Sequence, residues 1–331
     1  MSRLAGFVLA TFCCSVSFAA RCAPSDRSRQ AFESLVQDVT HSTGRTYGAV
    51  DSAGHTMDTV KIISDPAGGY LGVYHSMAKG VFDSHLAVST DLMHWTFCTQ
   101  LGTHASQPYI YDCGNGGFVV AWEQDPNNHI RVNYYTNRSD LLSGTVSRSF
   151  DAPQTLSPCA EGTPSIYSVK FTTSPADISS SIIDIGAHYY QDCKADRQQR
   201  GTLTNFQSWV TSPQGDIDKA VEAWGVRGNI GDRDALEYKG HLFGLIEGMF
   251  KPGDWASWDV YCYDYSTGKA DKLSISTDKG STAFANPSCS IVPAPKGSLA
   301  SGKAVVVTLF IPSEGAAPGE GGELIYYRTF H

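Results

Sequence analysis

The pattern of hydrophobic and polar positions along the chain predicts one helix followed by many short strands. Between Ser28 and Val39 apolar residues recur at helical spacing, and Thr43-Gly44 ends that pattern. Beyond it, short runs rich in Val, Ile, Tyr and Phe alternate with clusters of Gly, Asn, Asp and Pro. We therefore expect an all-β body preceded by a short N-terminal helix.

One unit recurs about five times along this body, at spacings of roughly 50 to 70 residues. It consists of a polar opening, a Gly-marked turn, an aromatic-rich strand, a third strand and a loop. The openings are Asp58-Thr59-Val60, Gln107-Pro108-Tyr109, Glu161 with Pro164-Ser165-Ile166, Asp234-Ala235-Leu236, and Asn286-Pro287-Ser288. Second strands are expected at 69–71, 117–119, 183–185, 241–243 and 304–306, and third strands at 85–89, 130–134, 206–211, 258–265 and 324–327.

A unit of short strands repeated radially is typical of a β-propeller. We predict a five-bladed β-propeller over residues 46–331, a helical segment over 21–45 and a signal peptide over 1–20. A two-sheet sandwich, which also uses evenly spaced strands, is the alternative. In a propeller the first strand of each blade lines the central channel, so the five openings should converge at one mouth.

Composition supports a secreted, turn-rich protein. Charged residues make up 18% of the chain and 32 residues are Gly, a balance that excludes a disordered chain or a coiled coil. Arg3, an apolar run and the small residues Ala19 and Ala20 are typical of a secretory signal, whose core is too short to cross a bilayer.

Net charge argues against nucleic acid as a partner. Without Arg3 the 25 Lys and Arg residues become 24, against 33 Asp and Glu, so the mature chain carries a charge near −9. No later apolar run reaches the length of a membrane span. We therefore expect a monomer without a nucleic-acid or membrane partner.

Seven cysteines remain after removal of the signal, and in an oxidising compartment they allow up to three disulfides and one free thiol. Their pairing is left open. No CxxC spacing occurs, so no metal site is predicted from them. The seven are Cys22, Cys98, Cys113, Cys159, Cys193, Cys262 and Cys289.

The segment from His85 to Trp95 contains Ser89-Thr90-Asp91-Leu92-Met93-His94-Trp95. It resembles the S-x-D-L-x-x-W hairpin of five-bladed propeller glycoside hydrolases, the arabinanase and β-xylosidase group of family 43 and its relatives. Weaker echoes occur at 139–141 and 205–209. We expect Asp91 to cap a turn and Trp95 to pack between blades, so this hairpin indicates the fold rather than the chemistry.

The resemblance implies chemistry at the strand openings. The family places a base Asp in the first blade, an orienting Asp in the second and an acid Glu in an E-G-P segment of the third. Asp58 is similar to the base, although Thr59 replaces the usual Pro, and Glu161 is similar to the acid, with Thr163 inserted before Pro164. Gln107 stands where the orienting Asp would be. The implied activity is cleavage of glycosidic bonds in polysaccharides, with arabinose or xylose residues as first substrates.

Glycoside cleavage needs two carboxyls, about 6.5 to 9.5 Å apart when a water molecule attacks and about 5 to 5.5 Å apart when a carboxylate attacks. Blades one and three face each other across the channel and suit the wider spacing. We therefore predict inversion, with Asp58 activating water and Glu161 protonating the leaving oxygen.

Further site residues are predicted around these two. Asp232, Arg233 and Asp234 place three charged side chains at the fourth opening, where Asp234 would act with the catalytic carboxyls and Asp232 and Arg233 would bind substrate. A salt-bridged loop that closes the propeller is the alternative. The remaining predicted substrate-binding residues are Gln107, His55, His75 and Asn286.

Two other functions stay open. Ser276-Thr277-Asp278-Lys279-Gly280-Ser281-Thr282 is close to the Asp-box turn of sialidase-like propellers, although Ala283 replaces its Trp. A non-catalytic carbohydrate-binding propeller is the second alternative, with Gln107 marking a decayed active site. No cofactor is predicted; the resemblance leaves room for a structural Ca²⁺ in the channel, but no ligand cluster specifies one.

Overall fold

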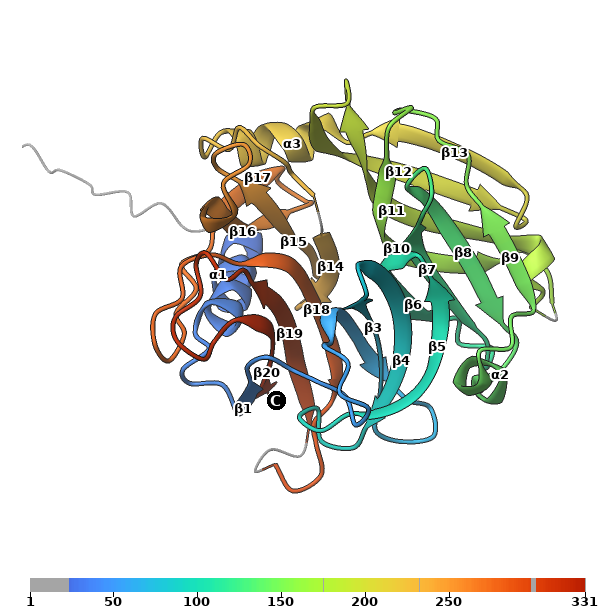
Figure 1. Cartoon of the computed structure of the whole chain (residues 1–331), viewed down its shortest axis with the longest axis horizontal. Helices are drawn as coiled ribbons and strands as arrows, with labels where there is room; N and C mark the ends of the chain where they lie inside the picture. Colours follow the sequence, from blue (N-terminus) through green and yellow to red (C-terminus); the bar gives the residue numbers. More distant parts are fainter. Residues whose placement is uncertain (1–23, 175, 232, 299–301, 331) are drawn as a thin grey trace, which may run out of the picture.

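The computed structural model of the chain describes residues 24–174, 176–231, 233–298 and 302–330 (Figure 1). They form five four-stranded antiparallel sheets arranged as the blades of a propeller, which confirms the predicted five-bladed β-propeller. The signal predicted at 1–20 and Cys22 lie outside the described residues. Within those residues, no helix is long and apolar enough to cross a membrane.

Each blade runs outward from an inner strand. Blade one comprises β2 (Asp58–Ser64), β3 (Tyr70–Ala78), β4 (Val81–Ser89) and β5 (Thr96–Thr103); blade two comprises β6 (Ala105–Asp112), β7 (Phe118–Gln124), β8 (His129–Tyr135) and β9 (Arg148–Asp151). Blade three comprises β10 (Glu161–Phe171), β11 (Ser181–Gln191), β12 (Ala195–Thr204) and β13 (Ser208–Pro213); blade four comprises β14 (Arg233–Tyr238), β15 (His241–Met249), β16 (Trp258–Asp264) and β17 (Lys269–Lys272). Blade five comprises β18 (Ala285–Pro293), β19 (Lys303–Ile311), β20 (Gly322–Phe330) and β1 (Gly44–Thr46).

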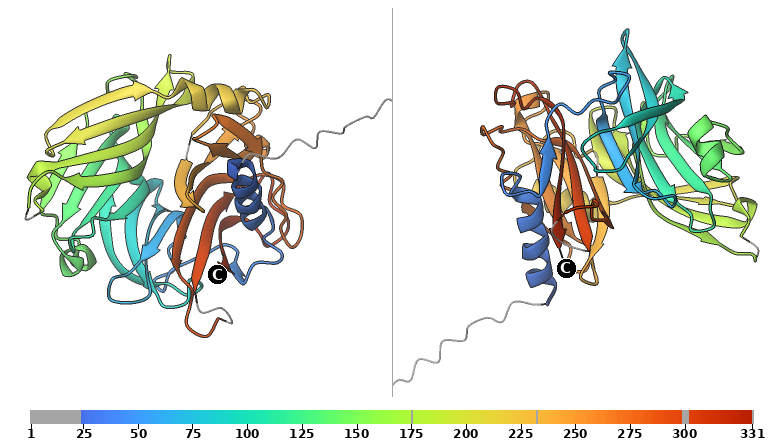
Figure 2. Two further views of the ribbon diagram at one scale, coloured as in Figure 1. Left: turned by 180° about the vertical axis from the view of Figure 1, so that it is seen from behind. Right: turned by 90° about the horizontal axis from the view of Figure 1, so that it is seen from below.

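Short helices decorate these sheets. The predicted N-terminal helix is α1 (Pro24–Gln37), whose Phe32 and Val36 are buried against Phe243 and Tyr326. Figure 2 shows α1 lying against blades four and five. The others are α2 (Arg138–Ser143), α3 (Gly215–Glu222), and the 3₁₀ turns η1 (Ile178–Ser180) and η2 (Trp255–Ser257).

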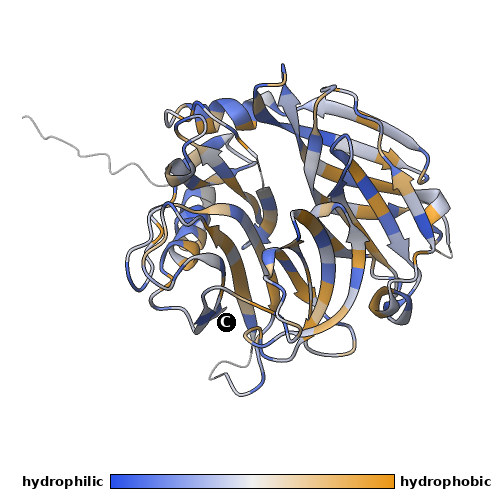
Figure 3. Cartoon of the chain, viewed as in Figure 1, coloured by the Kyte–Doolittle hydropathy of each residue, from blue (hydrophilic) through white to orange (hydrophobic). Residues whose placement is uncertain are grey.

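Hydrophobic residues recur along the strands, where they alternate with hydrophilic ones (Figure 3). Most neighbouring blades bury aliphatic and aromatic residues between them, as Leu71 and Val73 do against Val120 and Trp122. Blades three and four meet through a more polar contact, in which the hydroxyls of Tyr167 and Tyr265 lie 3.0 Å apart.

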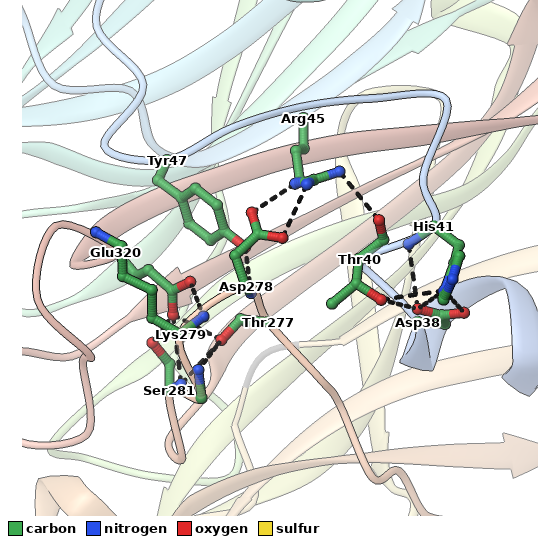
Figure 4. Close-up of polar contacts among 11 residues, drawn as sticks. Asp38, Thr40, His41, Arg45, Tyr47, Thr277, Asp278, Lys279, Ser281 and Glu320 are labelled. Carbon is green, nitrogen blue, oxygen red and sulfur yellow. Dashed lines mark hydrogen bonds and ion pairs between the residues drawn. The ribbon is translucent and has the colours of Figure 1, made fainter.

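The ring is closed by β1, which pairs with β20 through Gly44 opposite Tyr327 and Thr46 opposite Ile325. This strand was not predicted. Figure 4 shows the polar contacts that hold the closure: Arg45 of β1 donates to Asp278 at 2.6 Å. Beside it, Glu320 is buried; burial acts to raise its pKa, yet hydrogen bonds from Ser281 and Thr277 hold that pKa below its usual value.

Four of the five predicted third strands match β4, β8, β16 and β20, and the prediction for blade three is wrong. The third strand there is β12, whereas the predicted segment 206–211 falls largely in the fourth strand, β13. β12 opens with the polar run Ala195-Asp196-Arg197-Gln198-Gln199-Arg200, which lacks the apolar alternation used to find strands.

Among the described residues one disulfide forms, between Cys159 and Cys193, whereas the cysteine count allowed up to three. It ties the turn between β11 and β12 to the loop before β10. The other four described cysteines, Cys98, Cys113, Cys262 and Cys289, are free thiols.

Candidate functional site

The inner strands of four blades begin in the same way. Thr59, Gln107, Thr163 and Asn286 have positive φ angles of 59°, 54°, 50° and 48°. Each lies at a shift in register between the first and second strands of its blade. A bulge of this kind redirects the strand and its side chains, so four of the five predicted openings lie at equivalent positions around one mouth. The opening at Asp234 has no such bulge, because β14 pairs with β15 in an unbroken register.

Three of these bulges are held by a buried side chain of the preceding blade, which accepts a hydrogen bond from the bulge N–H. The pairs are Gln107 N to His75 Nδ1 at 2.9 Å, Asn286 N to Glu247 Oε2 at 2.6 Å, and Thr59 N to Glu323 Oε2 at 3.1 Å. His75 is therefore an acceptor inside the wall. Burial, with the nearby His85, lowers its pKa to about 3, so the ring is neutral.

Asp234 lies at the centre of the channel and is 1% exposed. Lys61 Nζ donates to its Oδ2 at 2.5 Å, and Tyr109 OH donates to its Oδ1 at 2.8 Å. Ser288 Oγ and Cys289 N add further bonds to Oδ2 at 2.9 and 3.0 Å. This carboxylate joins strands from four blades and has the contacts of a structural ion pair.

Glu161 is equally enclosed, with 2% of its surface exposed. Its Oε1 accepts hydrogen bonds from three consecutive backbone N–H groups, those of Thr155, Leu156 and Ser157. Its Oε2 accepts from Gln199 Nε2 at 3.3 Å. The Glu161 carboxyl is thus held by hydrogen bonds to the loop before β10, which also carries the disulfide-bonded Cys159. Its burial leaves almost no surface for contact with a substrate.

Asp58 differs, because it is partly exposed and has one side-chain donor, Thr56 Oγ1 at 2.9 Å. Burial raises the pKa of Asp58 above its usual value, against the effect of that hydrogen bond. Its neighbour Glu323 is 1% exposed, and burial together with the charge of Asp58 raises the pKa of Glu323 well above its usual value. The carboxyls of the predicted pair, Asp58 and Glu161, therefore have different hydrogen-bond partners.

Of the remaining predicted residues, one lines the axial cavity. Gln107 lines the axial cavity, and its buried Oε1 has no hydrogen-bond partner within the described residues. His55 precedes β2; its Nδ1 is 2.8 Å from Asp51 Oδ2 and its ring stacks on His85. The backbone of Arg233 pairs with Ile246 at the start of β14, and Asp232 lies outside the described residues.

One carboxyl that the sequence did not predict reaches the mouth. Glu123, near the end of β7, is partly exposed and packs on Gly162 of blade three, so that a Cβ built on Gly162 would lie 1.9 Å from Oε2. Aligning the second strands would have found it: Asp58 pairs with His75, Ser106 with Glu123 and Gly162 with His188. The same position therefore carries a titratable residue in three successive blades.

The channel itself is narrow. The axial cavity between the openings and Asp234 has a volume of about 20 Å³, room for about one water molecule. A larger cavity of about 330 Å³ lies at the opposite end of the channel, around Ile63, Tyr111 and Leu236. The axial cavity is therefore too small to hold a sugar ring.

The structure bears on two points that the sequence left open: the role of the Asp-box-like turn and a structural Ca²⁺ ion. In the Asp-box-like turn, Asp278 pairs with Arg45 and Thr277 with Glu320, so the turn serves to close the ring. Among the described residues, no group of three or more His, Cys, Asp or Glu side chains is placed to hold a metal ion.

Comparison with known proteins supports the fold. No protein-family model matches the sequence, and no curated protein matches it. Among solved structures, the chain is similar to a glycoside hydrolase, with 12% identity and a TM-score of 0.60 over 94% of this chain and 97% of that one. It is also similar to a thermostable family-43 glycoside hydrolase, with 12% identity and a TM-score of 0.51 over 85% and 92% of the two chains.

A third similar structure is a family-32 β-fructofuranosidase from Bombyx mori, with 11% identity and a TM-score of 0.50 over 92% of this chain and 65% of that one. The chain therefore has the five-bladed propeller fold seen in glycoside hydrolases, as the resemblance of its hairpin indicated.

Proposed function

We propose that this chain is a secreted glycoside hydrolase that acts at the mouth where the inner strands begin. The observation that carries the proposal is Asp58, a partly exposed carboxyl with a raised pKa at the opening of blade one. Enzymes place such groups at reacting centres because a pKa closer to the working pH favours proton transfer. The shared propeller fold supports the same activity.

In this proposal Asp58 takes a proton from water as the water attacks the anomeric carbon. Gln107 supports sugar binding through a water molecule, because its buried, unpaired amide oxygen lines an axial cavity with room for about one water that can bridge to a sugar hydroxyl. Glu161, predicted as the acid, fits better as a positioning residue, since four donors already hold it. Arabinose- or xylose-containing polysaccharides remain the first substrates to test, and inversion remains a prediction.

Secretion is part of the proposal. It is supported by the predicted signal and by the Cys159–Cys193 disulfide, which is stable in oxidising compartments.

A second candidate is a non-catalytic carbohydrate-binding propeller. The observation in its favour is that Glu161 and Asp234, two of the three predicted catalytic carboxyls, are buried and fully bonded. The left-handed openings themselves carry uncharged side chains, Thr59, Gln107, Thr163 and Asn286. Hydroxyls and amides of this kind bind sugars without cleaving them.

Hydrolysis assays separate these candidates. Wild type, Asp58→Asn and a control, Asp216→Asn at an exposed site on α3, are tested on aryl glycosides, arabinan, xylan and arabinoxylan. We expect turnover by wild type and control and a loss of about 10²- to 10⁴-fold in Asp58→Asn. Sugar binding without turnover by wild type would favour the second candidate, and release of sialic acid would favour a sialidase-like enzyme.

A further inference from the structure

The carboxyl of Glu123 lies where the opening of blade three has no side chain of its own. Gly162 precedes the left-handed Thr163 just as Asp58 precedes the left-handed Thr59. The Oε2 atom of Glu123 occupies the space into which a side chain on Gly162 would grow, 1.9 Å from its ideal Cβ position. The mouth therefore presents carboxyls at equivalent places on blades one and three, one from β2 and one from β7.

A short chain of contacts fixes the second carboxyl. Asn128 Nδ2 donates a hydrogen bond to Glu123 Oε1. The backbone oxygen of the same asparagine accepts from the Glu161 N–H at 2.8 Å and from Gln154 Nε2 at 3.2 Å. Asn128 is thus anchored to the start of β10 and orients Glu123 against it. The backbone N–H of Glu161 therefore helps to hold Asn128 in place.

The four carboxylate residues near the mouth and channel differ in exposure, which indicates the ones that a substrate can reach. Glu123 and Asp58 are both partly exposed, whereas Glu161 and Asp234 are 2% and 1% exposed. Two carboxyls on opposite sides of the bond are what hydrolysis of a glycoside requires. Among these four carboxyls, only Asp58 and Glu123 are both partly exposed and lie at equivalent positions of two inner strands, Asp58 on blade one and Glu123 at Gly162 of blade three.

We propose that Glu123 is the general acid of the reaction proposed above, with Asp58 as its base; this inference rests on that proposed function. The water oxygen bonds to the anomeric carbon while Asp58 takes the water proton. The bond from that carbon to the leaving oxygen breaks, its electron pair stays on the oxygen, and Glu123 supplies the proton. Asp58 ends protonated and Glu123 ionised, and exchange with solvent restores both.

Leaving groups of different basicity test this role. A carboxylic acid is needed to protonate an alcohol leaving group, but a glycosyl fluoride or a 2,4-dinitrophenyl glycoside departs without one. We expect Glu123→Gln to lose about 10²- to 10⁴-fold on arabinoxylan or the polysaccharide that wild type cleaves, and less than about 10-fold on the activated substrates. Asp58→Asn should lose activity on both.

Three variants complete the experiment. Glu237→Gln, at an exposed glutamate of β14, controls for the loss of one charge and should retain full activity. Asn128→Ala tests the orienting bond in case Glu123→Gln folds poorly; it should lower kcat with little change in KM and shift the alkaline limb of the pH profile. Circular dichroism verifies the fold of each.

The outcomes are distinct. Turnover by wild type with an unimpaired Glu123→Gln, or a leaving-group-dependent loss in Glu161→Gln instead, would overturn the assignment of Glu123 and leave the proposed hydrolase intact. Absence of turnover by wild type on every substrate would overturn the proposed hydrolase and the assignment together.

Discussion

The carboxyls of Asp58 and Glu161 both open inner strands, in blades one and three, yet they are held very differently. Glu161 accepts four hydrogen bonds and is buried, whereas Asp58 accepts one from a side chain and is partly exposed. Asp234, at the axis, belongs with Glu161. A carboxylate whose two oxygens are both hydrogen-bonded within the protein stabilises the fold, whereas a carboxylate with an unbonded oxygen can contact a substrate or a water molecule.

Among variants that test this difference, the largest change in the free energy of unfolding is expected at the axial pair of Lys61 and Asp234. Lys61→Met removes the cation beside Asp234 and leaves a buried carboxylate, which should lower the free energy of unfolding by about 3 to 5 kcal/mol. Urea unfolding measures it. The double variant Lys61→Met with Asp234→Leu should recover part of the loss, and a loss below about 1 kcal/mol would show that the axial pair is not structural.

The next effect concerns the brace behind Glu161. Replacing Cys159 and Cys193 by Ser opens a link between residues 34 apart in sequence and should lower the free energy of unfolding by about 3 kcal/mol. Urea unfolding under non-reducing conditions measures it. Cys98→Ser, at a free thiol, is the matched control and should change little; equal losses in both would contradict a bracing role.

A direct contrast between the two carboxyls comes third. Glu161→Gln places an amide N–H₂ group near the donor Gln199 and weakens the charge-assisted hydrogen bonds from the backbone of 155–157. We therefore expect the free energy of unfolding to fall by about 2 kcal/mol. Asp58→Asn should cost nothing at neutral pH, because burial makes the ionised form unfavourable in the fold. Thermal unfolding of both variants tests the contrast, which fails if their melting temperatures fall together.

The smallest expected effect is a pH dependence of the free energy of unfolding that arises from Glu323, the buried neighbour of Asp58. The pKa of Glu323 is raised in the folded state, so the folded chain binds the proton more tightly than the unfolded chain does. Stability from this group is therefore complete below the unfolded pKa and falls as pH rises from about 4.5 toward the folded pKa. Glu323→Gln should flatten that fall in unfolding experiments at successive pH values. Glu314→Gln, at an exposed carboxyl, should leave the fall in place.

Much of the fold could be predicted from sequence because its signals are local. In three blades a Pro directly follows the left-handed residue of the inner strand, at Gln107-Pro108, Thr163-Pro164 and Asn286-Pro287, so the openings can be recognised from a few adjacent residues. β1 could not be predicted, since a strand of three residues whose partner lies about 280 residues away leaves no local pattern. β12 was missed because polar side chains fill it.

The site was harder to predict for the same reason. Position alone identified Asp58 and Glu161 as strand openings, but the donors that occupy Glu161 come from the backbone of 155–157 and from Gln199 on another strand. Glu123 ends an apolar run and carries no motif of its own. Its place at the mouth depends on how blade two packs against Gly162 of blade three.

The pairing of residues 44–46 with residues 325–327 also constrains biosynthesis. The growing polypeptide presents β1 long before β20 has been translated, so the ring stays open until residues 322–330 have been synthesised. Blades one to four can assemble in order as they emerge, whereas blade five needs both β1 and β20. Loss of residues 322–330 should therefore be far more damaging than the length of that segment suggests.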